Sequence, residues 1–128
     1  MTTHIVTLGG GGFSMSRDGS PTNLDRYLVE LTGRRAPMVC FAPTASADDA
    51  SYIRRFLTAY GSLGVRTMVL TLWTDAAASV ARLPEADLVL VGAGGFSYEE
   101  AARLCGCSVG TLKARVSRAR KHLAEKLQ

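Results

Sequence analysis

The feature that most constrains this chain is a change in charge at Gly95–Phe96. Up to Gly95, eight arginines are balanced by eight aspartates and glutamates, whereas the residues after it carry seven basic side chains against three acidic ones. The whole formal net charge of +4 therefore lies in the last quarter of the chain. This asymmetry predicts a polyanionic partner for residues 96–128 and a neutral partner, or none, for the residues before them.

The composition is that of a folded soluble domain, with 47% hydrophobic and 20% charged residues. A chain of 128 residues is long enough for one core but hardly for two. The N-terminus lacks a basic stretch before its short apolar run, and no apolar stretch approaches the roughly 20 residues of a membrane helix. The three cysteines, Cys40, Cys105 and Cys107, suit neither a disulfide framework nor a zinc site. We therefore expect a cytoplasmic protein with reduced thiols, without metal or cofactor.

The first part of the chain predicts a parallel α/β fold. Four short apolar runs, each followed by a turn signal, predict strands. These runs are His4–Leu8, Met38–Ala42, Thr67–Leu72 and Asp87–Val91. Apolar residues at helical spacing separate them, within Leu24–Leu31, Ile53–Tyr60 and Val80–Leu83. Strands that alternate with helices indicate right-handed crossovers. The predicted fold class is therefore α/β, a truncated parallel sheet of about four strands with flanking helices, completed by a C-terminal helix-turn-helix.

Two glycine runs, Gly9–Gly12 and Gly92–Gly95, follow the first and last predicted strands, where parallel sheets bind ligands. A dinucleotide-binding fingerprint would need glycine at positions that Ser14 and Ser97 occupy, and no Gly-Lys-Ser/Thr follows either run. We therefore interpret these glycines mainly as residues that let the chain turn sharply, and any ligand of the two loops stays open.

Residues 4–95 resemble the N-terminal half of the peptidase E family (peptidase family S51), which contains aspartyl dipeptidases and cyanophycinases. The similarity rests, in this order and spacing, on Gly9–Met15, Asn23–Asp25, Phe41–Asp48, Tyr52 with Phe56, and Ala86–Gly95. In that family a further half-domain follows, with the nucleophilic serine in a Gly-x-Ser-x-Gly elbow and then the histidine. We predict that this chain lacks the elbow and is not an enzyme.

The residues themselves also argue against serine catalysis, which needs a base beside the hydroxyl and a third group that orients it. His4 opens the first predicted strand, at the wrong end for a site at the carboxyl edge, and His122 lies in a basic helix. Ser14 and Ser46 stand at strand ends and are interpreted as turn or cap residues. A residual serine-type dipeptidase that uses Ser14 or Ser46 remains an alternative.

Residues 96–127 predict two helices joined by a short turn. Ser97–Glu100 is a capping-box pattern, Gly106 ends the first helix, and Ser108 caps the second. One side of the second helix is apolar, and it is formed by Val109, Leu112, Val116, Ala119, Leu123 and Leu127. The remaining side chains are almost all basic or hydroxylic. This pattern predicts a helix-turn-helix with a cationic second helix.

The stretch Phe96–Arg120 resembles region 4 of extracytoplasmic-function sigma factors, above all in Val109–Arg120. In that family the second helix enters the major groove of the −35 promoter element, and the surrounding surface meets the β-flap of RNA polymerase. The resemblance and the basic face together give as candidate DNA-binding residues Thr111, Lys113, Arg115, Ser117, Arg118, Arg120 and Lys121. Ala114 departs from the serine common in the family, and the upstream helices of region 4 and all of region 2 have no counterpart.

We expect residues 1–95 and 96–128 to pack as one merged domain, with the apolar side of the last helix on the unfinished sheet. An open sheet edge favours association, so a symmetric homodimer is expected. The predicted function is non-catalytic, transcription-related DNA binding, with RNA polymerase as a further partner and no membrane partner. The alternatives are a protein-interaction or purely structural hybrid without DNA binding, and the residual dipeptidase.

Overall fold

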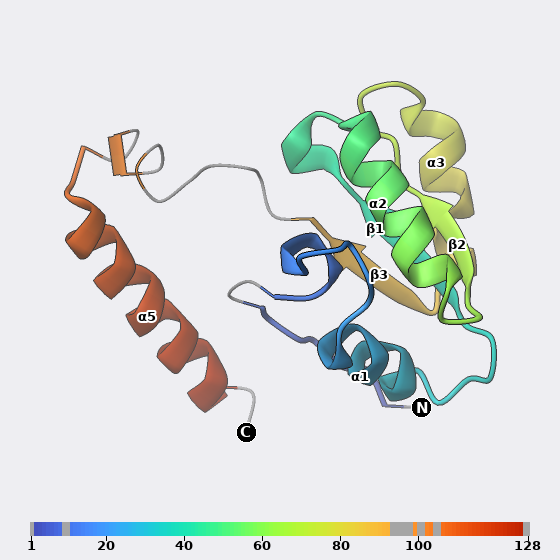
Figure 1. The fold of residues 1–128 in the computed structure, drawn as a ribbon, viewed down its shortest axis with the longest axis horizontal. Coiled ribbons are helices and arrows are strands. Elements are labelled where there is room, and N and C mark those ends of the chain that lie inside the picture. Colours follow the sequence, from blue (N-terminus) through green and yellow to red (C-terminus); the bar gives the residue numbers. More distant parts are fainter. Residues whose placement is uncertain (1, 9–10, 93–98, 100–101, 104–105, 127–128) are drawn as a thin grey trace. The chain divides into compact units, whose positions relative to one another are not determined.

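The computed structural model describes residues 2–8, 11–92, 99, 102–103 and 106–126. The chain divides into two compact units (Figure 1). Unit 1 contains residues 1–4 and 10–94, and unit 2 contains residues 5–9 and 95–128. Packing of the two predicted parts as one merged domain stays a prediction.

Unit 1 is built on a parallel sheet of three strands in the order β2-β1-β3. The strands are β1 (Met38–Ala42), β2 (Arg66–Val69) and β3 (Leu88–Val91). The central residue Val39 aligns with Thr67 of β2 and with Leu88 of β3. The α/β class with a parallel sheet is therefore confirmed, and the bounds of β1 are those that the apolar run predicted.

The prediction of a fourth strand at His4–Leu8 is wrong, because residues 2–8 form no strand and are exposed. Ile5, for example, keeps 71% of its surface accessible. An apolar, β-branched run becomes a strand only where a neighbouring backbone offers free partners. Strand β1 pairs on both sides, with β2 and β3, so only the outer edges of these two strands could take a fourth strand, and residues 2–8 form no strand there.

The described part of unit 1 has three α-helices: α1 (Asn23–Leu31) precedes β1, α2 (Ala50–Gly61) connects β1 to β2, and α3 (Ala76–Arg82) connects β2 to β3. Helices α1 and α2 contain the apolar positions that predict them, whereas α3 begins four residues before Val80 and ends before Leu83, which lies in a 3₁₀ helix. At the start of α1 the Asp25 carboxylate accepts hydrogen bonds from the backbone N–H and the hydroxyl of Thr22, at 2.7 and 2.9 Å. Asp49 caps α2, because its Oδ2 accepts the Tyr52 N–H at 2.8 Å.

The main core of unit 1 is an aromatic cluster around Phe41 of β1. The Phe41 ring stacks on Phe56 of α2, with centroids 4.7 Å apart, and meets Tyr52 edge-on at 4.9 Å. Phe13, from the 3₁₀ helix Phe13–Met15, lies about 6 Å from Phe41, Phe56 and Tyr60. The cluster therefore joins the segment before α1 to α2 and to the middle strand.

Tyr60 and Cys40 show how burial affects ionisable groups in this core. The Tyr60 hydroxyl donates to Asp25 Oδ1 at 2.9 Å. Burial, reinforced by the Asp25 carboxylate, raises the pKa of Tyr60 far above its usual range. Cys40 is buried beside Met68 and Leu70, and burial raises the pKa of its thiol, which disfavours the reactive thiolate.

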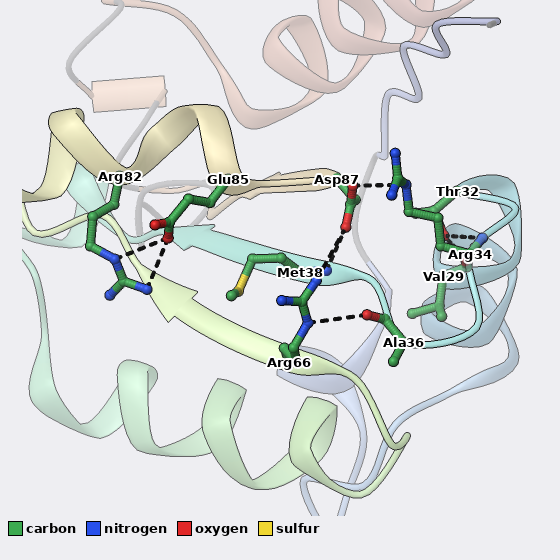
Figure 2. A network of polar contacts seen from close by, with 9 residues as sticks. All are labelled: Val29, Thr32, Arg34, Ala36, Met38, Arg66, Arg82, Glu85 and Asp87. Atoms are coloured by element: carbon green, nitrogen blue, oxygen red, sulfur yellow. Dashed lines mark hydrogen bonds and ion pairs between the residues drawn. The ribbon is translucent and has the colours of Figure 1, made fainter.

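The starts of all three strands are tied together by Asp87 (Figure 2). Its Oδ2 accepts the Met38 N–H at 2.8 Å, and its own N–H donates to the Met38 carbonyl at 2.8 Å. Arg34 Nε lies 3.0 Å from Asp87 Oδ1, and Arg66 reaches Oδ2 at 4.0 Å. Asp87, whose side chain is 16% exposed, thus joins the start of β3 to the start of β1 by two hydrogen bonds and contacts the first residue of β2 through an ion pair.

Replacement of this acceptor should weaken unit 1. We expect Asp87→Ala to lower the free energy of unfolding by about 1–3 kcal/mol, because the Met38 N–H loses its acceptor. The measurement is a urea titration followed by circular dichroism. As a matched control, Glu85→Ala removes the exposed ion pair with Arg82 and should cost less than about 0.5 kcal/mol. Equal losses in both variants would contradict the role given to Asp87.

Candidate nucleic-acid interface

The turn of the predicted helix-turn-helix is present in unit 2. Ala102 and Arg103 are helical, and Gly106 follows with φ +62°. The Gly106 N–H donates to the Arg103 carbonyl at 3.2 Å, and the Cys107 N–H donates to the Ala102 carbonyl at 3.0 Å. These two bonds form the Schellman motif that ends a helix at a left-handed residue. The predicted break at Gly106 is therefore confirmed.

Ser108 begins the second helix, α5 (Val109–Lys126). Its Oγ accepts the Thr111 N–H at 3.1 Å and lies 2.9 Å from Thr111 Oγ1, to which it donates. Its carbonyl accepts the Leu112 N–H at 3.0 Å. Ser108 is thus the predicted N-cap, which fixes the direction in which α5 leaves the turn. The capping box predicted at Ser97–Glu100 falls outside the described residues except for Glu99, which is helical.

Six of the seven predicted DNA-binding residues have exposed side chains, and they are Thr111, Lys113, Arg115, Ser117, Arg118 and Lys121. The side chain of the seventh, Arg120, lies outside the described part. With 3.6 residues per turn, Ser117, Arg118 and Lys121 fall within about one third of the helix circumference. Lys113 and Arg115 flank them on opposite sides.

The opposite side of α5 begins with Val109 and Leu112, which are half-buried. The side chains of Val116, Ala119, Leu123 and Leu127, which continue the predicted apolar side, lie outside the described part. Glu125, near the end of the helix, is the single acidic residue in the sequence of α5. The exposed side of α5 is therefore cationic along its first three turns, which suits a surface that meets phosphate groups.

The prediction that the chain has no Gly-x-Ser-x-Gly pattern is wrong, because Gly106–Gly110 reads Gly-Cys-Ser-Val-Gly. In a nucleophile elbow the serine stands between a strand and a helix. Here Ser108 follows a turn that ends helical residues, and its hydroxyl is bonded to Thr111. The letters match, but the backbone is that of a helix-turn-helix.

Ser14 and Ser46, the other serines considered for catalysis, lie in short 3₁₀ helices. Ser46 Oγ donates to the Pro43 carbonyl at 2.8 Å, within the turn after β1. Ser14 lies in the 3₁₀ helix Phe13–Met15, and its carbonyl accepts a hydrogen bond from Arg55. His4 is exposed, and the side chain of His122 lies outside the described part.

No group of three or more His, Cys, Asp or Glu residues in the described part of the chain is arranged to hold a metal ion. None of the described helices combines the length and the apolar character needed to span a bilayer.

The turn predicts opposite effects for two nearby glycine substitutions. Gly106→Ala should lower the stability of unit 2 by about 1 kcal/mol, because a Cβ is disfavoured at φ +62°. Gly110→Ala, inside α5 with only an ordinary contact near the new Cβ, should instead raise stability by up to about 1 kcal/mol. Thermal unfolding followed by helical circular dichroism measures both. If both variants shift in the same direction, the turn geometry is wrong.

Two family models match the sequence. The model of peptidase family S51 matches residues 5–99, and that of sigma-70, region 4, matches residues 88–123. The uncharacterized peptidase YgaJ of Bacillus subtilis is 38% identical over 91 residues, which is 70% of this chain and 39% of that protein. No solved structure matches.

The curated relatives of the C-terminal part are sigma factors. The ECF RNA polymerase sigma factor EcfG of Rhodopseudomonas palustris is 68% identical over 37 residues, covering 29% of this chain and 20% of that protein. The probable RNA polymerase sigma-C factor of Mycobacterium bovis is 42% identical over 59 residues, covering 46% of this chain and 28% of that protein. The chain thus spans well under half the length of each of these relatives. By its larger match the chain belongs to peptidase family S51, and its C-terminal part carries a helix-turn-helix of the sigma-70 region 4 type.

Proposed function

We propose that this protein binds duplex DNA through the exposed side of α5 and acts without catalysis in a process related to transcription. The observation that carries the proposal is a capped helix, fixed by a glycine turn, with exposed Arg115, Arg118 and Lys121 on one side. The match to sigma-70, region 4, and the sigma-factor relatives support it. A recognition helix of this kind enters the major groove of DNA.

The chemistry of the exposed side suits a duplex. Lysine and arginine neutralise phosphates and release counterions, and arginine also donates two hydrogen bonds to a guanine edge. Thr111 and Ser117 are exposed hydroxyls that can donate to phosphate oxygens. Arg120 joins this set through its position in the region 4 pattern. Together these residues supply phosphate contacts, which position the helix, and base contacts, which read the DNA sequence.

The absence of peptidase activity is part of the proposal. It is supported by the engagement of the hydroxyls of Ser108 and Ser46 in local hydrogen bonds. Because the chain belongs to peptidase family S51, a residual serine-type dipeptidase is the alternative. Turnover of an Asp-X dipeptide that survives purification and disappears in Ser14→Ala or Ser46→Ala would overturn the non-catalytic proposal without touching DNA binding.

RNA polymerase is a second candidate partner, favoured by the sigma-factor relatives, which are named as polymerase factors. A pull-down of polymerase by a protein that fails to shift DNA would select this alternative. The proposed homodimer would present two copies of α5, and half-sites about 34–36 Å apart would then bind it best.

Salt dependence gives the sharpest test of the DNA proposal. In mobility shifts at two or more salt concentrations, affinity should fall steeply with salt. The double variant Arg115→Ala/Arg118→Ala should reduce the slope of log K against log salt by about 2, one for each lost phosphate contact. Loss of a base contact would appear instead as relaxed preference among DNA sequences.

The matched control removes two arginines from the charge-balanced part of the chain. Arg35 and Arg54 are also exposed, and Arg35→Ala/Arg54→Ala changes the net charge by the same amount. This control should leave the slope within about 0.3 of the parent value. Equal slopes in both double variants, or no shift at low salt, would refute α5 as the DNA-binding surface.

A further inference from the structure

Strand β3 is an edge strand, and its outer side has no neighbouring strand in the described part of the chain. In the order β2-β1-β3 it lies at one end of the sheet, paired with β1, and residues 2–8 form no strand. The free side of an edge strand offers backbone N–H and C=O groups to a further strand. Charged residues and prolines usually discourage such pairing, but β3 reads Leu-Val-Leu-Val and contains neither.

The opposite edge of the sheet, formed by β2, has a different character. Its first residue is Arg66, whose side chain is 62% exposed. A charged side chain on an edge strand disfavours the addition of another strand, because its solvation would be lost. Of the two outer edges, that of β3 is therefore the one suited to pairing.

The side chains of β3 make this edge apolar on both faces of the sheet. Leu88 and Leu90 pack against the aromatic core on the face that α2 covers. Because side chains alternate along a strand, Val89 and Val91 point to the other face. They keep 45% and 72% of their surface accessible. Exposed valines thus lie directly beside a row of unpaired backbone groups, which is the combination that favours strand association.

We propose that β3 pairs antiparallel with β3 of a second copy of this chain, so that the two sheets become one continuous sheet. In an antiparallel pair, residues that lie opposite each other point to the same face. A symmetric pairing centred on Leu90 places Val89 opposite Val91 of the partner subunit, and the exposed valines of both copies meet. A pairing centred on Val89 would instead place Val91 opposite the Asp87 carboxylate, which is already ion-paired with Arg34.

Charge and symmetry favour a second copy over other occupants of this edge. Strand β3 has no charge with which to attract a charged peptide or a nucleic acid. Residues 1–95 carry equal numbers of acidic and basic side chains, so two copies of unit 1 approach each other without net repulsion. The two-fold pairing also meets each exposed valine with an equally apolar surface. The inference gives the homodimer an interface, and it does not depend on DNA binding by α5.

The mass of the full chain in solution tests the proposal. Light scattering over a concentration series should show the mass rising from that of one chain to twice that value. The midpoint should lie at about 10–100 μM, because paired edges form a small interface. Unlike DNA binding, this association should not weaken with added salt, since apolar contacts and backbone hydrogen bonds carry it.

Two lysine variants separate the β3 edge from the rest of the surface. Val91→Lys should weaken dimerisation by about tenfold or more, because it brings a charge from each copy to the paired edge. Val80→Lys is the matched control, since Val80 lies in α3 and is 51% exposed. It should leave the dissociation constant unchanged. Both variants replace exposed side chains, so each should keep the circular dichroism spectrum of the parent.

Disulfide cross-linking tests the register independently of the lysine variants. In a Cys105→Ser/Cys107→Ser background, Val89→Cys chains are mixed with Val91→Cys chains under mild oxidation. The mixed dimer should form several times faster than either homodimer, because positions 89 and 91 lie opposite each other only between copies.

Four outcomes would each overturn the proposal. They are a monomer at every concentration, assemblies larger than a dimer, equal weakening by the two lysine variants, and equal cross-linking rates in mixed and unmixed samples. The double variant Arg115→Ala/Arg118→Ala should dimerise like the parent. Failure of the DNA proposal would therefore leave this test unaffected.

Discussion

The packing of aromatic rings on Phe41 is the interaction on which the rest of unit 1 depends. Phe41 sits in the middle strand, is fully buried, and touches rings from α2 and from the segment before α1. It also explains Gly92, since a Cβ there would lie 3.1 Å from both the Phe41 and the Tyr52 rings. The glycine after β3 therefore leaves room for two rings that a Cβ would crowd, whereas the sequence had suggested only a sharp turn.

Local sequence patterns were enough to locate the elements whose two ends are marked by nearby residues. The run Met38–Ala42 is bounded by Pro37 and Pro43, so both ends of β1 are marked in the sequence. The run His4–Leu8 has similar composition but is exposed and unpaired. Whether a run joins a sheet depends on competition for the edges of its neighbours, and that information is not local.

The same distinction holds at the candidate sites. Gly106 and Ser108 were predicted because a left-handed turn and an N-cap demand particular residues within a few positions. The hydrogen bonds of Trp73 to Asp48 and Thr44 could not be predicted in this way, because they span 25 and 29 positions. Gly106–Gly110 shows that a local motif can also mislead. Its sequence matches a nucleophile elbow, but it lies in a turn before a helix and not after a strand.

The arginine side chains have different surroundings in unit 1 and in α5. In unit 1, Arg34 and Arg66 meet Asp87, Arg82 meets Glu85, and Arg55 donates to a carbonyl, so these charges serve the fold. In α5 the exposed Arg115 and Arg118 have no acidic residue within one turn in the sequence. Their field therefore extends into solvent over about a Debye length. The arginines of the proposed interface are thus different residues from those that form ion pairs around the sheet of unit 1.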